Sequence, residues 1–365
     1  MNQYLATQYD VFMSLVRLGI GHSSGLVKGP VDWNIVFALA MHHKLVAVAF
    51  DGLDVLEKQG TQPDDGPATE LKDKWISQTI GCEIRYNRCC DTLSEMAAFF
   101  RIHGIKMMVL KGYSLSLDWP VPNHRTSGDI DIWLFGRQKE GDDLVIKEKG
   151  LTVDNSHHHH TTFLWGKMLI ENHFDFINVH NHRSHQSLEK ILKELAQDDS
   201  CSTEINGERV FLASPKLAAL FLLKHTMLHF VSYDFSFRQI LDWAFFAQKH
   251  GKELDWDWLL AVLEEQGMLP LFHIFNAICI EDFGFDTSIF PHVEADPLLK
   301  ERVRHEIYYP SFKGGEPNGK FFYRVCYKTK RWISGIWKQK LCYKESIWSS
   351  FWSGIWSHLM KPASI

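Results

Sequence analysis

The fold of this chain is set by residues 105–136, which read IKMMVLKGYSLSLDWPVPNHRTSGDIDIWLFG. The first part, IKMMVLKG (105–112), is a short apolar run that ends in glycine, and the last part, DIDIWLFG (129–136), alternates with period two. Both patterns predict β-strands. The segment YSLSLDWP (113–120) between them is long enough for one or two helical turns before the prolines of the WPVP step interrupt the chain. The stretch therefore predicts a strand, a short helix and a second strand.

More elements of the same unit follow along the chain. The segment RQKEGDDLVIKEKG (137–150) is rich in charge and predicts a surface helix. The segments LTVDNSHHHHTTFLW (151–165) and KMLIENHFDFINVH (167–180) predict two strands of a hairpin that turns at Gly166-Lys167. The middle of the chain is therefore predicted to be an α+β unit with a small mixed β-sheet.

Helical periodicity flanks this unit on both sides. From residue 4 to about residue 100, apolar residues recur at steps of three and four, which predicts four or five helices, the last of them long and ending near Gly104. After residue 187 the same periodicity returns, and it predicts helices over 237–249 and 256–266. We therefore divide the chain into an N-terminal helical domain (1–100), a core (101–186) and a C-terminal helical region (187–365).

The C-terminal helical region includes a basic, tryptophan-rich tail. Residues 313–344 hold nine basic side chains and one acidic side chain. Trp348, Trp352 and Trp356 follow at a spacing of four, which places them on one helical stripe. Three interpretations are open: a helical face packed on the rest of the protein, a surface for RNA, and a membrane-surface helix. We favour packing, because tryptophans at this spacing bury well and lysine stems can cover such a surface.

The composition is that of a folded globular chain. Of the 365 residues, 45% are hydrophobic and 23% are charged, which excludes wholesale disorder and a fibrous repeat. The formal net charge of -5 is too small to indicate a dedicated polyanion-binding domain, so any contact with nucleic acid must come from a local patch. Seven cysteines without a repeated CxxC spacing argue against a disulfide framework and against a zinc module.

The sequence shows neither a basic leader followed by an apolar stretch nor an uninterrupted apolar run of about 18 residues. We therefore expect a cytoplasmic protein without a membrane span. Nothing in the pattern predicts the oligomeric state.

Two aspartates in the second predicted strand carry the strongest chemical signal. Residues i and i+2 of a strand point to the same face, so Asp129 and Asp131 project together while Ile130 and Ile132 enter the core. Their Cβ atoms are expected roughly 6 to 7 Å apart, a span that suits two divalent cations about 3.5–4 Å from one another. The alternative is an exposed edge strand with two solvated aspartates.

The order of these motifs resembles the nucleotidyltransferase superfamily that includes DNA polymerase beta, in which an acid-x-acid strand follows a strand with a small-residue turn and precedes a strand with one more acid. LKG (110–112), WPVP (119–122) and R-x-x-G-D-I-D-I (125–132) are more closely similar to an uncharacterised bacterial nucleotidyltransferase family. The similarity covers roughly residues 106–173. It implies a small mixed β-sheet nucleotidyltransferase core flanked by N-terminal and C-terminal helical domains.

The resemblance implies a metal site and names its ligands. Asp129 and Asp131 take the positions of the two aspartates that bind catalytic Mg²⁺, or Mn²⁺, in that superfamily. The third acid is expected on the later strand, where Glu171-Asn172-His173 matches a family pattern of acid, any residue, histidine. Glu171 could hold a metal ion or act as the general base. Asp175 shares its face by the same period-two count and is the alternative.

The resemblance also implies a site for the nucleoside triphosphate. Gly112 and the helical turn after it would bring backbone amides close to the phosphates. Tyr113 departs from the superfamily, which has a second glycine or a serine there, and Ser114 is our candidate for the missing hydroxyl. Lys111 and Arg125 could neutralise charge on the nucleotide or on pyrophosphate, or form plain surface salt bridges.

Histidines and one helical ion pair leave further alternatives open. The run 157–160, followed by four more histidines up to residue 185, suggests a metal site, but alternate residues of a strand face opposite ways, so at most His157 with His159, or His158 with His160, can converge. One such pair could instead line the nucleotide cleft. His225 and His229, four apart on a helix, are typical of core or rim residues. Arg238 and Asp242 have the same spacing and most simply form a helix ion pair, with a role in positioning substrate left open.

Together these observations predict a metal-dependent nucleotidyltransferase that transfers a nucleoside monophosphate from an NTP to an acceptor and releases pyrophosphate. The acceptor is a small molecule, a sugar, RNA or protein, and the sequence does not distinguish among them. Two alternatives remain: a non-catalytic nucleotide-binding or interaction module, and a toxin-like transferase that acts on RNA or protein.

Overall fold

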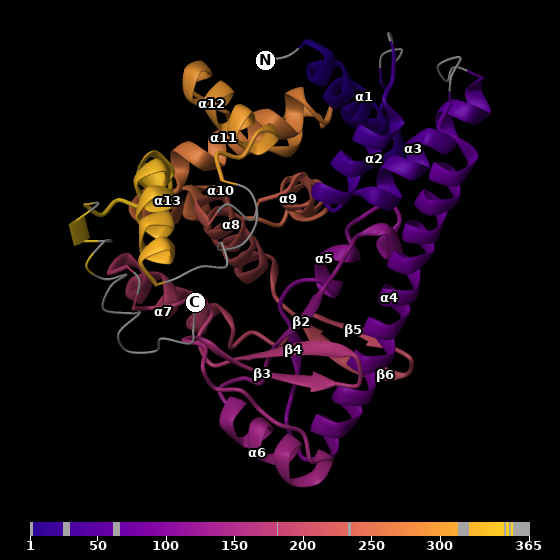
Figure 1. Cartoon of the computed structure of the whole chain (residues 1–365). Coiled ribbons are helices and arrows are strands. Elements are labelled where there is room, and N and C mark those ends of the chain that lie inside the picture. The colour runs from indigo at the N-terminus through magenta and orange to yellow at the C-terminus, as the bar shows by residue number, and fades with distance from the viewer. Residues whose placement is uncertain are drawn as a thin grey trace.

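The computed structural model describes residues 3–24, 30–60, 66–180, 182–232, 235–312, 321–346, 348–349 and 352. Its centre is one six-stranded mixed sheet with the strand order β3-β4-β2-β1-β6-β5. Most helices from both ends of the chain gather on one side of this sheet, whereas helix α6 (Gln138–Lys149) and the second half of helix α4 (Thr69–Ile102) pack on the opposite side (Figure 1). The α+β class that the sequence predicts is therefore confirmed.

In the described part of the chain, four helices precede the sheet, which agrees with the predicted four or five. They are α1 (Gln3–Gly19), α2 (Trp33–His42), α3 (Val46–Gln59) and α4 (Thr69–Ile102). Asp32 caps α2 by accepting hydrogen bonds from the next turn, and Gly60 ends α3 in the left-handed conformation. Helices α1 and α3 pack closely because Gly52 has no side chain: a Cβ there would lie 1.9 Å from the carbonyl oxygen of Leu15.

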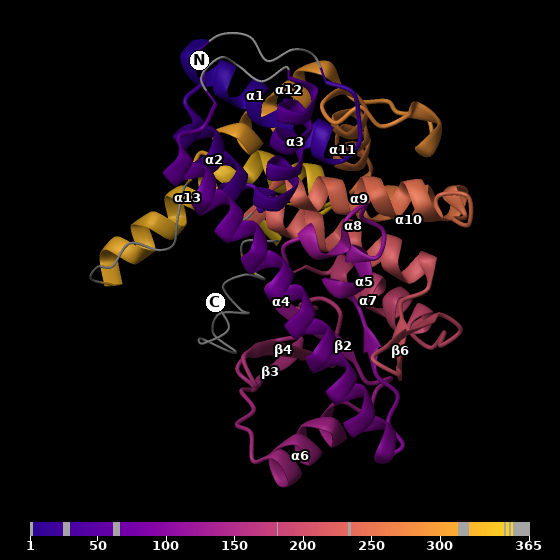
Figure 2. The same ribbon diagram turned by 90° about the vertical axis from the view of Figure 1, so that its right-hand side faces the viewer.

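Helix α4 joins two hydrophobic cores. Its first half places Trp75 in the larger core, where the indole N–H donates to the carbonyl of Val46 at 2.7 Å. Its second half buries Leu93 and Phe100 in a separate core beneath the strands. Figure 2 shows the helix running from the N-terminal helices along the sheet. The helix therefore ties the N-terminal helices to the sheet through a single rigid element of 34 residues.

The strands of the core lie where the sequence predicts them, and short helices connect them. In chain order the elements are β1 (Met108–Val109), α5 (Tyr113–Ser116), η1 (Pro122–His124), β2 (Asp129–Trp133), α6 (Gln138–Lys149), β3 (His160–Trp165) and β4 (Met168–His173). Strands β3 and β4 form the predicted hairpin around Gly166-Lys167. Strand β4 runs parallel to β2, whereas β1 is antiparallel to β2.

Two strands lie beyond the predicted core. Helix α7 (Ser184–Leu195) is followed by β5 (Ser202–Ile205) and β6 (Glu208–Leu212), and β6 pairs in parallel with β1. This hairpin is not among the elements that the local pattern predicts. Its turn is Asn206-Gly207, and both residues have positive φ angles, 49° and 84°. Asn-Gly is the strongest short signal for such a turn, but β5 carries one apolar residue, and the three of β6 are consecutive, so neither strand shows an alternating pattern.

The remaining helices form most of the larger core. They are α8 (Pro215–Ser232), α9 (Phe237–His250), α10 (Trp256–Gln266), α11 (Leu269–Glu281), η2 (Thr287–Ile289), α12 (Pro297–Tyr308) and α13 (Phe321–Cys342). Helices α9 and α10 confirm the two predicted ranges to within one residue. Among the described helices, none combines the length and apolar character that a membrane span requires.

The basic tail follows the packing interpretation only in part. Helix α13 packs on the larger core through Trp337, and the buried Lys338 ammonium lies 3.0 Å from Glu306 on α12. Trp348 and Trp352 are 71% and 65% exposed, so these two side chains are not buried as the packing interpretation expected. The third tryptophan of the stripe, Trp356, lies outside the described residues.

Candidate functional site

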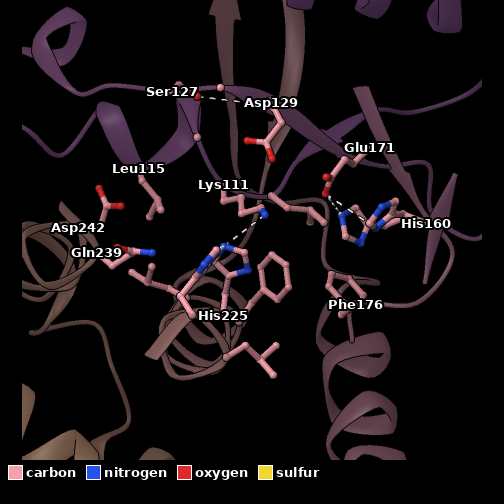
Figure 3. A pocket seen from close by; sticks show the side chains of 18 of the residues that line it. Lys111, Leu115, Ser127, Asp129, His160, Glu171, Phe176, His225, Gln239 and Asp242 are labelled. Atoms are coloured by element: carbon pink, nitrogen blue, oxygen red, sulfur yellow. Dashed lines mark hydrogen bonds and ion pairs between the residues drawn. The ribbon is translucent and has the colours of Figure 1, made fainter. Parts of the chain in front are cut away.

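A cavity of about 770 Å³ lies where the sheet meets the helices. Strands β2 and β4 and the turn after β1 form one wall, and α8 and α9 form the opposite wall. Figure 3 shows Asp129 and Glu171 on the sheet side of this cavity and His225 and Gln239 on the helix side. Lys44, from the turn between α2 and α3, and Arg85 of α4 also line it. The cavity is therefore assembled from all three parts of the chain.

The predicted acids lie on two neighbouring strands. In the parallel pairing of β2 with β4, Asp131 is directly opposite Glu171, and Asp129 precedes Asp131 by two residues on the same face. Asp131 is fully buried, whereas Asp129 and Glu171 are partly buried and line the cavity. Two of the three acids therefore line the sheet side of the cavity, and the third, Asp131, is buried between neighbouring strands behind this wall.

Lys111 neutralises part of this charge. Its backbone follows β1, and its ammonium nitrogen lies 2.9 Å from Asp131 Oδ1 and 3.4 Å from His225 Nε2. Burial opposes the charged form of this side chain, but the carboxylates of Asp131, Asp129 and Glu171 outweigh burial, so the pKa of Lys111 is raised above its usual value. Lys111 is therefore a fixed cation beside the acids.

His173 at the end of β4 contacts the same acids. Its Nε2 atom lies 3.1 Å from Asp131 Oδ1 and 3.7 Å from Glu171 Oε2, and its Nδ1 atom lies 3.0 Å from the carbonyl oxygen of Asp175. Burial disfavours the imidazolium, but the hydrogen bonds to Asp131 and Glu171 outweigh burial and raise the pKa of His173 to about 9. Burial opposes the charged form of Glu171, but the hydrogen bond from His173 and the charge of Lys111 outweigh burial and lower the pKa of the Glu171 carboxyl.

The residues present fit a divalent cation. Asp131 Oδ2 is buried and has no hydrogen-bond partner among the described residues, which leaves one carboxylate oxygen available as a ligand. Ligand atoms of Asp131, Glu171 and His173 all lie within 4.8 Å of one another. Among the described residues, no group that meets this distance contains Asp129. The compact set is therefore two predicted acids and a histidine, with Asp129 beside it in the cavity wall.

The predicted phosphate-binding residues are only partly brought together. Gly112 lines the cavity with a φ of 71°, and a Cβ there would lie 3.1 Å from Ser127 Oγ. Ser114 lies in α5 and is absent from the described lining of the cavity, whereas Thr126 and Ser127 belong to it. The hydroxyl groups nearest the glycine turn thus come from the segment before β2.

Arg125 forms a buried ion pair within the protein. Its Nε and Nη2 atoms donate to the two carboxylate oxygens of Asp242 at 2.6 and 2.9 Å, and Asp242 also accepts from Trp119 Nε1 at 2.9 Å. Arg238 lies 3.1 Å from Asp242, so the predicted helix ion pair is confirmed, although it is buried and shared with Arg125. Arg125 also lines the cavity.

The histidine run does not behave as a strand. Strand β3 begins at His160, and residues 157–159 lie in a bend before it. The expectation that only alternate histidines of the run converge is therefore wrong, because period-two alternation applies only to extended backbone. The adjacent residues His159 and His160 both come within 4.8 Å of His173.

Several residues of the cavity have no signal in the local sequence. Lys44 and Arg85 come from the N-terminal helices, and Phe176 and Gln239 come from segments more than 60 residues apart. Lys44 adopts a positive φ of 59° just after the C-terminus of α2, where the amide of Leu45 donates to the carbonyl of Ala40 at 2.9 Å and closes the helix. No spacing rule relates these residues, because only long-range packing brings them to one cavity.

The comparisons with known proteins bear on this site. Residues 29–284 match the model of a family described as uncharacterised nucleotidyltransferase. Neither the curated proteins nor the solved structures gave a match. The matched range contains every cavity residue from Lys44 to Asp242, so it extends well beyond residues 106–173, on which the resemblance in sequence rested.

Proposed function

This chain belongs to the uncharacterised nucleotidyltransferase family, and from this premise we propose that it is a metal-dependent enzyme that transfers a nucleoside monophosphate from an NTP to an acceptor. An acceptor oxygen attacks the α-phosphorus, the bond to the β-phosphate oxygen breaks, and pyrophosphate leaves. The acceptor hydroxyl loses its proton to Glu171 or to water. The acceptor is a small molecule, a sugar, RNA or protein.

The register of β2 and β4 carries this proposal. Asp131 lies directly opposite Glu171, with Asp129 two residues earlier on the same face. Asp129 and Glu171 line the cavity, and Asp131 is buried beside Glu171. A divalent cation bound by these side chains would stabilise charge on the phosphate oxygens. Solvated aspartates on an edge strand do not account for this arrangement, because β2 is an inner strand and Asp131 is fully buried.

The cationic side chains around the cavity support a polyphosphate ligand. Lys44, Arg85, Lys111 and Arg238 line it from four different segments of the chain, with Lys111 beside the acids and Arg238 on α9 in the opposite wall. A volume of about 770 Å³ lies within the range of about 300–1,000 Å³ that small-ligand sites occupy. Gly112 leaves the backbone beside Asp129 accessible, because it contributes no side chain to the cavity wall.

Thermal unfolding tests the proposal directly. We would measure the melting temperature with each of the four common NTPs, with and without Mg²⁺, for the wild type and for the double variant Asp129→Asn/Asp131→Asn. A ligand that binds only the folded state raises the melting temperature by mass action. We expect a metal-dependent increase that is lost in the double variant and retained in Asp257→Asn, an exposed position on α10. An equal increase in the double variant would place the nucleotide elsewhere and contradict the proposal.

Transfer is tested separately from binding. With α-labelled NTP and candidate acceptors of each class, we expect a labelled product and pyrophosphate from the wild type only. Binding of NTP without any pyrophosphate release would favour the non-catalytic module. Toxicity on expression that Asp131→Asn abolishes would favour the toxin-like transferase.

A further inference from the structure

Three imidazoles and two carboxylates meet at one end of the β3-β4 hairpin. His160 is paired with His173 across the two strands, and Glu171 precedes His173 by two residues. Ligand atoms form two compact groups that share His173: Asp131, Glu171, His173 and His159, His160, His173. Figure 3 shows Glu171 pointing toward the ring of His160. The histidine run is thus joined to the acid site and is not a separate surface feature.

The ring of His160 is buried without hydrogen bonds. It is 6% exposed, and neither of its nitrogens has a hydrogen-bond partner among the described residues. Its Nδ1 atom lies 3.8 Å from Glu171 Oε2, which is beyond hydrogen-bond distance. Buried polar atoms without partners are rare and costly, and a bound ion is one explanation for them. An ion between His160 and Glu171 would satisfy both side chains.

The surroundings of His173 indicate which of its nitrogens faces a ligand. A carbonyl oxygen can only accept, so Nδ1, 3.0 Å from the carbonyl of Asp175, carries the hydrogen. Nε2 is therefore the ring nitrogen that faces Asp131 Oδ1 at 3.1 Å and Glu171 Oε2 at 3.7 Å. A metal ion bound there would replace the proton that the imidazolium form shares with these carboxylates. A backbone carbonyl that orients the other ring nitrogen is the usual support of a metal-binding histidine.

The separations suit coordination of a single ion. Metal bonds of about 2.0–2.2 Å place neighbouring ligand atoms about 3.0–3.5 Å apart. The Asp131–His173 contact of 3.1 Å is already in that range, and Glu171 Oε2 lies 3.7 Å from His173 and 3.8 Å from His160. Among the described residues, His160 belongs to the compact group of His159 and His173, so its side chain must move toward the carboxylates to share their ion. Lys111 approaches Asp131 at Oδ1, and Oδ2 remains without a partner among the described residues.

We propose that His173 and His160 act as nitrogen ligands beside Asp131 and Glu171, so that this site binds a transition cation such as Zn²⁺ in preference to Mg²⁺. This inference rests on the proposed function for the role of the cation and adds the chemical class of that cation. Mg²⁺ favours oxygen ligands and retains several waters, whereas imidazole suits zinc and its neighbours. The affinity for nitrogen ligands also rises from Mn²⁺ to Zn²⁺. The expected order of affinity is therefore Zn²⁺, then Mn²⁺, then Mg²⁺.

Direct metal binding to the full chain tests the inference. After removal of metal with a chelator, we would titrate Zn²⁺, Mn²⁺ and Mg²⁺ calorimetrically and determine bound metal by mass spectrometry. We expect Zn²⁺ to bind at least about tenfold more tightly than Mg²⁺. His160→Gln and His173→Gln should each lower the affinity for Zn²⁺ by about 10- to 100-fold, because each removes a nitrogen ligand. The affinity for Mg²⁺ should change less than about threefold.

The same histidine run provides the matched control. His158 is 7% exposed, close to the 6% of His160, but belongs to neither compact group. His158→Gln should bind Zn²⁺ as the wild type does. Equal loss in all three variants, or tighter binding of Mg²⁺ than of Zn²⁺ by the wild type, would overturn the inference.

A spectroscopic measurement covers the case in which His173→Gln fails to fold. The electron paramagnetic resonance spectrum of Cu²⁺ bound to the wild type should show hyperfine splitting from nitrogen ligands, reduced in a folded His160→Gln. A spectrum with oxygen ligands only would overturn the inference. If the protein prefers Zn²⁺ but binds no nucleotide, only the proposed function is contradicted. If it binds nucleotide with Mg²⁺ and shows no preference for Zn²⁺, only the metal inference is contradicted.

Discussion

The two carboxylate oxygens of Asp242 accept hydrogen bonds from Nε and Nη2 of Arg125, at 2.6 and 2.9 Å, across 117 residues of sequence. The side chains are 3% and 2% exposed. Arg125 lies just before β2, which carries the aspartates, and Asp242 lies on α9 in the opposite wall of the cavity. The pair therefore fixes the distance between the two walls.

Replacing Asp242 by alanine should strongly destabilise the protein, because Arg125 would remain buried without its partner. We expect the free energy of unfolding to fall by about 3–5 kcal/mol, measured by urea denaturation followed by circular dichroism. Asp54→Ala removes the exposed ion pair with Lys58 on α3 and should leave the transition almost unchanged. Similar transitions for the two variants would contradict the structural role of the Arg125 pair.

Glu171 and Asp175 can be separated experimentally as candidates for the third acid. Glu171 lines the cavity, whereas Asp175 pairs with Lys193 on α7 and is absent from the described lining. Glu171→Gln should remove the metal-dependent increase in melting temperature with NTP, and Asp175→Asn should retain it. The opposite pattern would assign the third acid to Asp175.

Gly112 should tolerate no side chain. Its φ of 71° and ψ of -101° are accessible mainly to glycine, and a Cβ would lie 3.1 Å from Ser127 Oγ. Gly112→Ala should lower the free energy of unfolding by about 1–3 kcal/mol and weaken NTP binding. Gly128→Ala, where a Cβ would meet no described atom within 4 Å, is the control for stability. Equal urea midpoints for the two variants would count against a strained turn.

Glu189 of α7 should make stability depend on pH. Its buried carboxyl accepts hydrogen bonds from the amides of Phe176 and Ile177 at 3.0 and 3.1 Å, and burial raises its pKa from 4.5 to about 7. Between pH 4.5 and 7 the folded state therefore holds a proton that the unfolded chain has lost. The contribution of Glu189 to stability is fully present below pH 4.5 and is lost as the pH rises through 7. Between these two limits of pH, the contribution of Glu189 to the free energy of unfolding changes by about 3 kcal/mol.

Urea denaturation at pH 5 and pH 8 checks this sign. The wild type should lose more stability than Glu189→Gln on going to the higher pH. Glu194→Gln, at an exposed position of the same helix, should follow the wild type. A Glu189→Gln profile parallel to that of the wild type would show that the carboxyl is not protonated in the folded state.

Local patterns predicted most of the core elements. The alternation in DIDIW and the turn at Gly166-Lys167 gave β2, β3 and β4 in their observed places. The hairpin of β5 and β6 was missed because its short strands lack that alternation, although Asn206-Gly207 marks its turn. Its partner β1 is only two residues long, so the pairing depends on the sheet as a whole.

The sequence by itself determined that Asp129 and Asp131 share one face of a strand, because backbone geometry alone relates residues two apart. Only the tertiary structure decided that Glu171 lies opposite Asp131, since that register depends on how β4 pairs with β2. Likewise, His173 meets Asp131 across 42 residues, and Arg125 meets Asp242 across 117. Such contacts arise from packing of elements distant in the chain, and no local spacing rule encodes them.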